Sequence, residues 1–297
     1  MYKPIIILSV LVLAFCACSE KKRPPLLKEL KSNLARFVFE YDEQGLLKKA
    51  YAWYDLMGKG MDKQPNLTYD FRHIPDSAMI RCELQRPDSS MNQQMDRAAI
   101  TYLQDSAGRI VLIIRGQPFE NGGDTGWDTT RISWNKEGAI TSIARDHDAH
   151  MKEWDLVNGD LMTRHLKNQW TPFPATITYT PRYSQINNPF PKDRNYILLT
   201  SVLQQYALGN LLFDHEFLYS RHLPESLITN RSFADPSIKD SLWTGEKLED
   251  KYKYEFDAHK NLVLCEVRFT ERSVSNGREV ADSTAKEDTL TWHFRYQ

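Results

Sequence analysis

The sequence predicts a mainly β protein, built as one long antiparallel meander with one or two short helices. Two observations indicate this class. First, apolar and aromatic residues alternate with polar ones in short runs, as in FVFEY at 37–41 and CEVRF at 265–269. Such a period of two is typical of a strand with one buried face. Second, one turn motif recurs between these runs.

This motif is an Asp or Asn, two further residues and then Gly, at 42–45, 105–108 and 135–138. The Asx side chain accepts a hydrogen bond from a backbone N–H two residues later, and Gly tolerates the positive φ that completes the turn. Versions one residue longer are predicted at 155–159 and 257–261, with Asn261 as the left-handed residue. The copies are irregularly spaced, whereas a propeller or solenoid needs a fixed period.

The chain is predicted to divide into three parts. Residues 1–17 form a signal peptide, and 18–35 form a tether or a short helix, because leucines recur there at helical spacing. Residues 36–297 form a single antiparallel β domain, with a polar insertion around 57–92 that prolines interrupt. Within this domain a helix is predicted from Asp193, as its cap, to a stop at Gly209.

The N-terminus indicates a lipid anchor. An apolar run too short to span a bilayer ends in Phe15-Cys16-Ala17-Cys18. This resembles a bacterial lipoprotein signal, in which the peptide is cut before a diacylated cysteine. Cys18 is the better acceptor because a small residue precedes it, whereas bulky Phe15 precedes Cys16. An ordinary secretory signal is the alternative.

Composition limits the partners of the mature chain. The formal net charge is −1 and 26% of residues are charged. A nucleic-acid-binding chain is expected to carry a basic excess, so nucleic acid is excluded as the predicted partner. The predicted location is the cell envelope, on the outer membrane facing the periplasm, with the cell surface as the alternative.

Several segments resemble a known family. These are the hairpins FEYDEQGLLKKA and YEFDAHKNLVLCEV, the segment ATITYTPRYSQINNP at 175–189, and the stretch LGNLLFDHEFLYSRHLPESLI at 208–228. They resemble uncharacterised lipoproteins of the Bacteroidetes type, described as a domain of unknown function with a porin-like fold. The hairpins are also similar to the tyrosine–aspartate (YD) repeats of secreted toxins. The resemblance implies a strongly curved antiparallel sheet rolled toward a barrel on a lipid anchor, and no catalytic residues.

Two cysteines remain in the mature part, Cys82 and Cys265. In an oxidising envelope they can pair as a disulfide. Two separate buried thiols are the alternative, because spacing in the sequence does not show whether the two side chains meet.

Other candidate site residues are few. Asp148 and His150 fall on one face of a predicted return strand, so they are the candidate ligands of a metal site, against a solvated strand end as the alternative. Trp127, in a Gly-rich loop, is a candidate platform for stacking a ligand. No sequence motif for nucleophilic catalysis or nucleotide binding is present, and no cofactor is predicted.

The predicted function is therefore a non-catalytic envelope lipoprotein, a binding or accessory module with a curved aromatic-rich sheet. Besides the membrane itself, its partner is a glycan, a lipid or an envelope protein. One alternative is a glycan hydrolase with carboxylates on the concave face. The other is a lipid or lipoprotein carrier, which requires an apolar cavity.

Overall fold

The computed structural model describes residues 25–55, 61, 63–74, 77–85, 97–116, 127–147, 150–162, 164–168, 175–189, 194–204, 220–233, 244–275, 278–279 and 286–297. These residues form one large antiparallel sheet and one short helix, α2 (Arg194–Gln204), which confirms the mainly β class. The strands are β1 (Leu27–Lys31), β2 (Ala35–Tyr41), β3 (Leu47–Tyr54), β4 (Leu67–His73), β5 (Met79–Gln85), β6 (Arg97–Gln104), β7 (Ile110–Gly116), β8 (Trp127–Trp134), β9 (Ile140–His147), β10 (His150–Val157), β11 (Asp160–Leu161), β12 (Arg164–Asn168), β13 (Ala175–Asn187), β14 (His222–Phe233), β15 (Thr244–Phe256), β16 (Leu262–Ser275), β17 (Arg278–Glu279) and β18 (Lys286–Tyr296).

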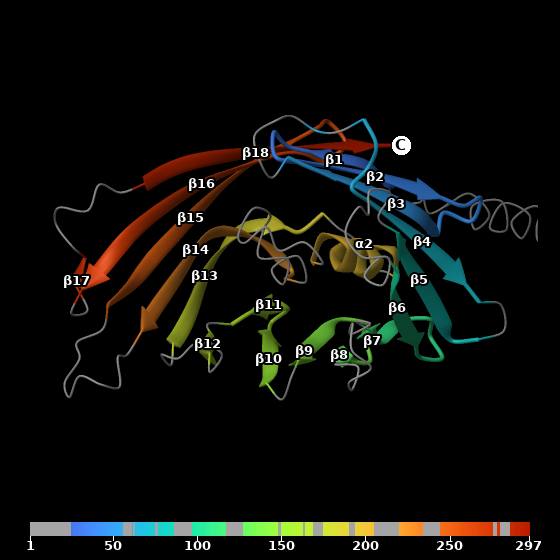
Figure 1. Cartoon of the computed structure of the whole chain (residues 1–297), viewed down its shortest axis with the longest axis horizontal. Coiled ribbons are helices and arrows are strands. Elements are labelled where there is room, and N and C mark those ends of the chain that lie inside the picture. Colours follow the sequence, from blue (N-terminus) through green and yellow to red (C-terminus); the bar gives the residue numbers. More distant parts are fainter. Residues whose placement is uncertain are drawn as a thin grey trace, which may run out of the picture.

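The sheet is a meander in which the first and the last strand of the chain pair with each other. Neighbours along the chain pair from β1 to β11 and again from β12 to β16, while β16 also pairs with β18. The first strand, β1, pairs with both β2 and β18, so the N-terminal and C-terminal strands lie side by side. Figure 1 shows the strongly curved sheet that results, with α2 inside the curve. The predicted rolling of the sheet is confirmed.

Alternation along the strands gives the sheet a mainly apolar inner face and a more polar outer face. On β2, Phe37 and Phe39 are buried, whereas Arg36 and Glu40 lie on the opposite face. On β18, Trp292 is buried and its neighbours point outward. Because side chains alternate strictly across a strand, this pattern fixes the pairing register throughout the sheet.

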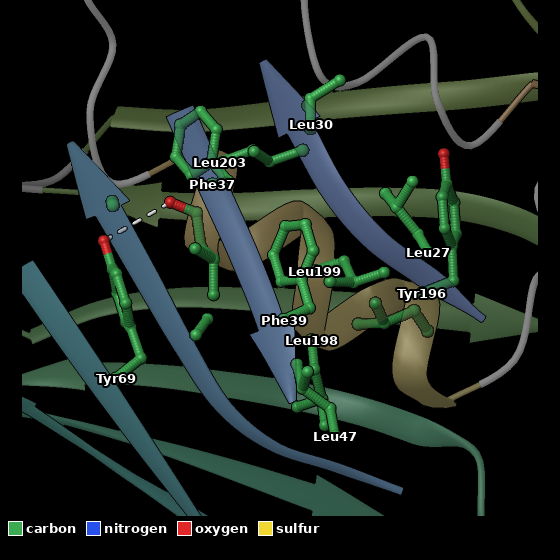
Figure 2. Close-up of a cluster of buried hydrophobic side chains, with 14 of the residues drawn as sticks. Leu27, Leu30, Phe37, Phe39, Leu47, Tyr69, Tyr196, Leu198, Leu199 and Leu203 are labelled. Atoms are coloured by element: carbon green, nitrogen blue, oxygen red, sulfur yellow. Dashed lines mark hydrogen bonds between the residues drawn. The ribbon is translucent and has the colours of Figure 1, made fainter. Parts of the chain in front are cut away.

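One buried part of the core lies between α2 and the strands β1 to β4. Figure 2 shows Phe37, Phe39 and Tyr69 of the sheet pointing toward the apolar side chains of the helix. The Tyr69 hydroxyl donates to the Val202 carbonyl at 3.5 Å. At the start of the helix, the Asn195 amide accepts a hydrogen bond from Leu47 N–H and donates to the Gly45 carbonyl, at 2.9 and 2.6 Å. These polar bonds fix where α2 lies on the apolar inner face.

The three short turns have the predicted chemistry. In the first, the Asp42 carboxylate accepts hydrogen bonds from the N–H groups of Gln44 and Leu46, at 2.9 and 2.8 Å. Gly45 has φ of 79°, and Gly108 and Gly138 have equivalent values in the other two turns. The side chain at the start of each turn thus occupies the N–H groups that the tight turn leaves without strand partners.

The two longer turns differ from the prediction. Near 155–159, Asp155 belongs to β10, and the turn is the two-residue loop Asn158-Gly159, both with positive φ. This is the usual backbone of a two-residue hairpin. At 257–261 the left-handed residue is Lys260, with φ of 65°, and Asn261 is wrong in that role. The loop has the same length as the short turns, with Lys where they have Gly.

The segment before residue 36 also differs. A short helix was one prediction for 18–35, but Leu27–Lys31 is a strand. A β-bulge between Leu27 and Glu29 explains the error, because the extra residue places Leu27 and Leu30 on the same face although they are three apart. The spacing of the leucines, which indicated a helix, is therefore produced here by a bulged strand.

The remaining predictions for the domain are mixed. The segment predicted as a polar insertion, around 57–92, contains two regular strands, β4 and β5, whose alternating residues pack into the core. The predicted helix is confirmed over Arg194–Gln204, while Asp193 and Gly209 lie outside the described residues. In the described ranges, the structure has no helix with the length and apolarity that a bilayer crossing requires.

Candidate functional site: the tyrosine face of β13, β15 and β16

Part of the inner face is aromatic but only partly covered. We call it the tyrosine face; its members pack against the core yet keep intermediate exposure, and they are Tyr179, Tyr183, Tyr252, Tyr254, Phe256 and Phe269. The strand register places Tyr252 opposite Val267 and Tyr254 opposite Cys265, on the buried side of β16. These side chains therefore line the same inner face as the core under α2.

The sequence builds this face by simple alternation along β15. Tyr252 and Tyr254 point inward, while Lys251, Lys253 and Glu255 are exposed on the outer side. The two tyrosine rings are stacked, with centroids 6.4 Å apart and planes 4° from parallel. Partly exposed rings held parallel on one strand offer apolar aromatic area to a ligand.

The tyrosine hydroxyls are held by fixed partners. Tyr254 donates to the Pro224 carbonyl at 2.6 Å. The Tyr183 hydroxyl contacts Ser220 Oγ at 2.9 Å and donates to the Leu161 carbonyl at 3.1 Å. Burial raises the pKa of both phenols far above neutrality. These groups therefore act as neutral hydrogen-bonding groups and supply no general base at neutral pH.

One end of the face is acidic. Phe269 pairs with Asp250 on β15 and with Asp288 on β18, so a carboxylate lies on each side of the ring. Asp250 is only 8% exposed, whereas Asp288 is exposed. Two strand spacings separate the two backbones, about 10 Å. Flat rings beside carboxylate acceptors suit a ligand that has both apolar faces and hydroxyl donors.

A second polar cluster, which the sequence analysis did not predict, lies where β11, β13 and β14 meet. The Asp160 carboxylate accepts a hydrogen bond from His222 N–H at 2.8 Å and lies 2.7 Å from His222 Nδ1. Ser220, next to this pair in sequence, is completely buried, and its Oγ accepts a hydrogen bond from Leu161 N–H. A buried, hydrogen-bonded serine is no accessible nucleophile, so the cluster fastens the β10–β11 hairpin to the sheet.

The two mature cysteines are separate. Cys82 and Cys265 are both free thiols with no solvent exposure. Five strands, β4, β3, β2, β1 and β18, lie between their strands β5 and β16 in the sheet. Burial raises the pKa of both thiols, so they pack as small apolar groups. The disulfide is thus absent from this structure, and the alternative of two buried thiols describes it.

The other predicted site residues stay untested. Cys18 and Asp148 lie outside the described residues. Trp127 and His150 begin β8 and β10, and their side chains also fall outside what the structure describes. Within the described part of the chain, no group of three or more His, Cys, Asp or Glu side chains could hold a metal ion.

Comparison with known proteins identifies a similar fold but says nothing about activity. No protein-family model matches the chain, and no curated protein does. A porin-like protein from Bacteroides uniformis ATCC 8492 is 14% identical and superposes with a TM-score of 0.51, over 93% of this chain and 98% of that one. A porin-like protein from Bacteroides vulgatus ATCC 8482 is 10% identical, with a TM-score of 0.39 over 92% of this chain and 99% of that one. The chain is therefore similar in fold to the first of these porin-like proteins.

Proposed function

We propose that the chain is a non-catalytic, lipid-anchored binding module of the bacterial cell envelope, and that its tyrosine face binds a glycan. The observation that carries this proposal is the incomplete cover of the aromatic inner face. Under α2 the aromatic side chains are fully buried, whereas those of β13, β15 and β16 keep intermediate exposure. Exposed aromatic area costs hydration free energy unless a ligand covers it.

A glycan fits this face better than a lipid does. Sugar rings stack on flat aromatic surfaces such as the parallel pair Tyr252 and Tyr254. Their hydroxyl groups need acceptors, which Asp250 and Asp288 supply at the acidic end. An acyl chain offers no hydrogen-bond donor to the exposed Asp288, and covering a carboxylate with hydrocarbon removes its water at a high cost.

The charged residues on the outer face support a position of the β domain in water beside the membrane, rather than inside the hydrocarbon of the bilayer. On β15 the outward residues Lys251, Lys253 and Glu255 are exposed and charged. A charged side chain facing lipid tails costs about 2–4 kcal/mol at the bilayer midplane. The anchor at Cys18 then accounts for membrane attachment.

Glycan binding is tested by titrating purified envelope polysaccharides and oligosaccharides into the acylated full chain, followed by calorimetry. Tyr252→Ala is expected to weaken binding at least tenfold, because it removes one of the two stacked rings. Lys251→Ala, the next residue but on the outer face, is the matched control and is expected to leave affinity unchanged. Equal affinity of the two variants would falsify the assignment of this face.

The anchor is tested separately by mass spectrometry of the protein from bacterial membranes. Cys18→Ser is expected to abolish acylation and signal cleavage, while Cys16→Ser leaves both intact. Acylation that persists in the Cys18→Ser chain would assign the anchor to Cys16. A chain that is cleaved but never acylated would support the ordinary secretory signal.

A glycan hydrolase is the second candidate, and the flanking of Phe269 by Asp250 and Asp288 favours it. Paired carboxyl groups of inverting glycosidases lie about 6.5–9.5 Å apart. If the pair is catalytic, Asp250→Asn abolishes release of reducing sugar while binding persists. If the chain only binds, neither the parent chain nor this variant releases sugar from a polysaccharide that it binds.

A further inference from the structure

The seam between the first and last strands fixes where the chain leaves the sheet. β1 lies between β18 and β2, and Gln297 N–H donates to the Leu26 carbonyl at 3.0 Å. The chain that precedes Pro25 therefore joins the sheet at this seam, next to the C-terminus.

The distance from this seam to the anchor is short. Residues 19–24 separate the proposed acylated Cys18 from Pro25. Even fully extended, this length of chain spans about 25 Å. An anchored chain therefore keeps the start of β1, and with it the seam strands, within about that distance of the membrane surface.

The outer face of these seam strands is basic. We call the outward side chains of β18, β1, β2 and β3 the seam face. The register places Lys31 between His293 and Arg36, and Glu29 between Arg295 and Val38. The basic members are Lys28, Lys31, Arg36, Lys49, His293 and Arg295, and the acidic ones are Glu29, Glu40 and Glu287.

Two aromatic side chains complete the face. Tyr51 and Trp53 lie on the outer side of β3 with centroids 6.3 Å apart, and the Arg36 guanidinium lies 5.0 Å from the centre of the Trp53 ring. Glu29 holds both guanidinium groups, with Arg36 at 2.7 Å and Arg295 at 2.8 Å. Trp, Tyr and basic side chains together are the composition of the membrane–water interface.

Lys31 and Lys49 are available for a partner, since neither joins an ion pair within the described part of the chain. The outer face of β4 and β5 differs, because its Asp70 and Glu83 balance Arg72 and Arg81. Arg72 and Glu83 lie 3.4 Å apart there. The positive excess of the seam face therefore does not continue over β4 and β5.

We propose that the seam face docks on the anionic headgroups of the membrane that holds the anchor. This inference rests on the lipid anchor of the proposed function and adds an orientation to it. The occupant follows from two features, the short chain between anchor and seam and the basic charge of the face. An anionic surface attracts each nearby Lys or Arg with an affinity gain of about fivefold.

The test uses the acylated full chain in vesicles of phosphatidylcholine, with or without about one third phosphatidylglycerol. One probe is a fluorophore on His293→Cys in the seam face, and its control is the same fluorophore on Arg81→Cys of β5. Cys82 and Cys265 have no solvent exposure and stay unlabelled, and the parent chain measures any background. A quencher on the lipid headgroups reports how close each probe lies to the surface.

The His293→Cys probe is expected to be quenched several-fold more than the control, in anionic vesicles only. High salt and the pair Lys31→Glu and Lys49→Glu are each expected to remove the difference. The pair Lys251→Glu and Lys253→Glu changes net charge equally on β15 and is expected to leave the difference intact. Equal quenching of the two probes, or a difference that survives Lys31→Glu and Lys49→Glu, overturns the docking.

Failure of the anchor gives a separate result. Without acyl chains, the protein does not float with phosphatidylcholine vesicles. The seam face can still be tested without the anchor. Docking then requires that the chain float with anionic vesicles in low salt. It also requires that the double variant Lys31→Glu and Lys49→Glu abolish this flotation. No flotation with either vesicle overturns both the anchor and the docking.

Discussion

The inner faces of β2 to β4 and of β15 to β16 have the same sequence pattern but different cover. On both, aromatic residues alternate with polar ones. Under α2, Phe37, Phe39 and Tyr69 are at most 2% exposed, whereas Tyr252 and Tyr254 keep intermediate exposure. Alternation thus determines which side chains face inward, and the position of the helix determines which of them are sealed. We infer that the partly covered face is the one used for binding.

Truncating one aromatic ring on each face gives the largest expected contrast. Phe39→Ala is expected to lower the free energy of unfolding by about 4 kcal/mol, because a fully buried ring leaves a cavity. Phe269→Ala is expected to lower it by about half as much, because its ring is only partly buried. Urea unfolding measures both. Equal losses would show that the two faces are equally covered.

The polar attachment of α2 is the next largest effect. Asn195→Ala removes the hydrogen bonds to Leu47 N–H and the Gly45 carbonyl, and is expected to cost about 1–3 kcal/mol. The matched control is Asn261→Ala, whose side chain donates to Asp257 in a loop that water reaches. We expect that control to cost less than about 1 kcal/mol, since water replaces the lost partner. A larger cost for the loop variant would contradict the role of Asn195 in placing the helix.

These features separate what the sequence could predict from what it could not. The turns at 42–45, 105–108 and 135–138 were predictable because Asx and Gly act locally. Strand β1 was not, because a bulge gave its leucines the spacing of a helix. For the tyrosine face, the sequence predicted only that aromatic residues are abundant. Which of their rings α2 covers depends on contacts between segments that lie far apart in the sequence. The Asp160–His222 pair joins residues 62 positions apart, and no local sequence pattern predicts such a contact.

The turns offer a smaller, internally controlled comparison. Lys260 and Gly138 occupy the same left-handed position, with φ of 65° and 79°. Gly138→Ala is expected to cost about 1 kcal/mol from backbone strain alone, because a Cβ added there meets no atom within 4 Å. Lys260→Gly is expected to stabilise by about 0.5 kcal/mol, the relief of strain less the greater entropy of Gly in the unfolded chain. Thermal unfolding of both variants measures the difference, and a destabilised Lys260→Gly chain would contradict a strained Lys260.

The smallest expected effect is the acid response of the same turns. Hydrogen bonds from Arg109 lower the pKa of Asp105, and those from Asn261 lower the pKa of Asp257. A carboxylate with a lowered pKa in the folded chain stabilises it above the unfolded pKa, and this contribution is lost as the pH falls below about 4. Both groups are at the surface, so solvent screening keeps the effect small.

Asn135 shows how to isolate that effect, because it fills the equivalent position without a charge and its Oδ1 accepts Ala139 N–H at 2.8 Å. Asp105→Asn is therefore expected to keep its turn while removing one group that titrates with a lowered pKa. Between neutral pH and about pH 3, the free energy of unfolding of this variant should decrease less steeply with falling pH than that of the parent chain. If the free energy of unfolding fell equally steeply with pH in both chains, the Arg109 contact would contribute nothing to folding. The hydrogen bonds to the turn backbone would then be enough to hold this turn, as they are at Asn135.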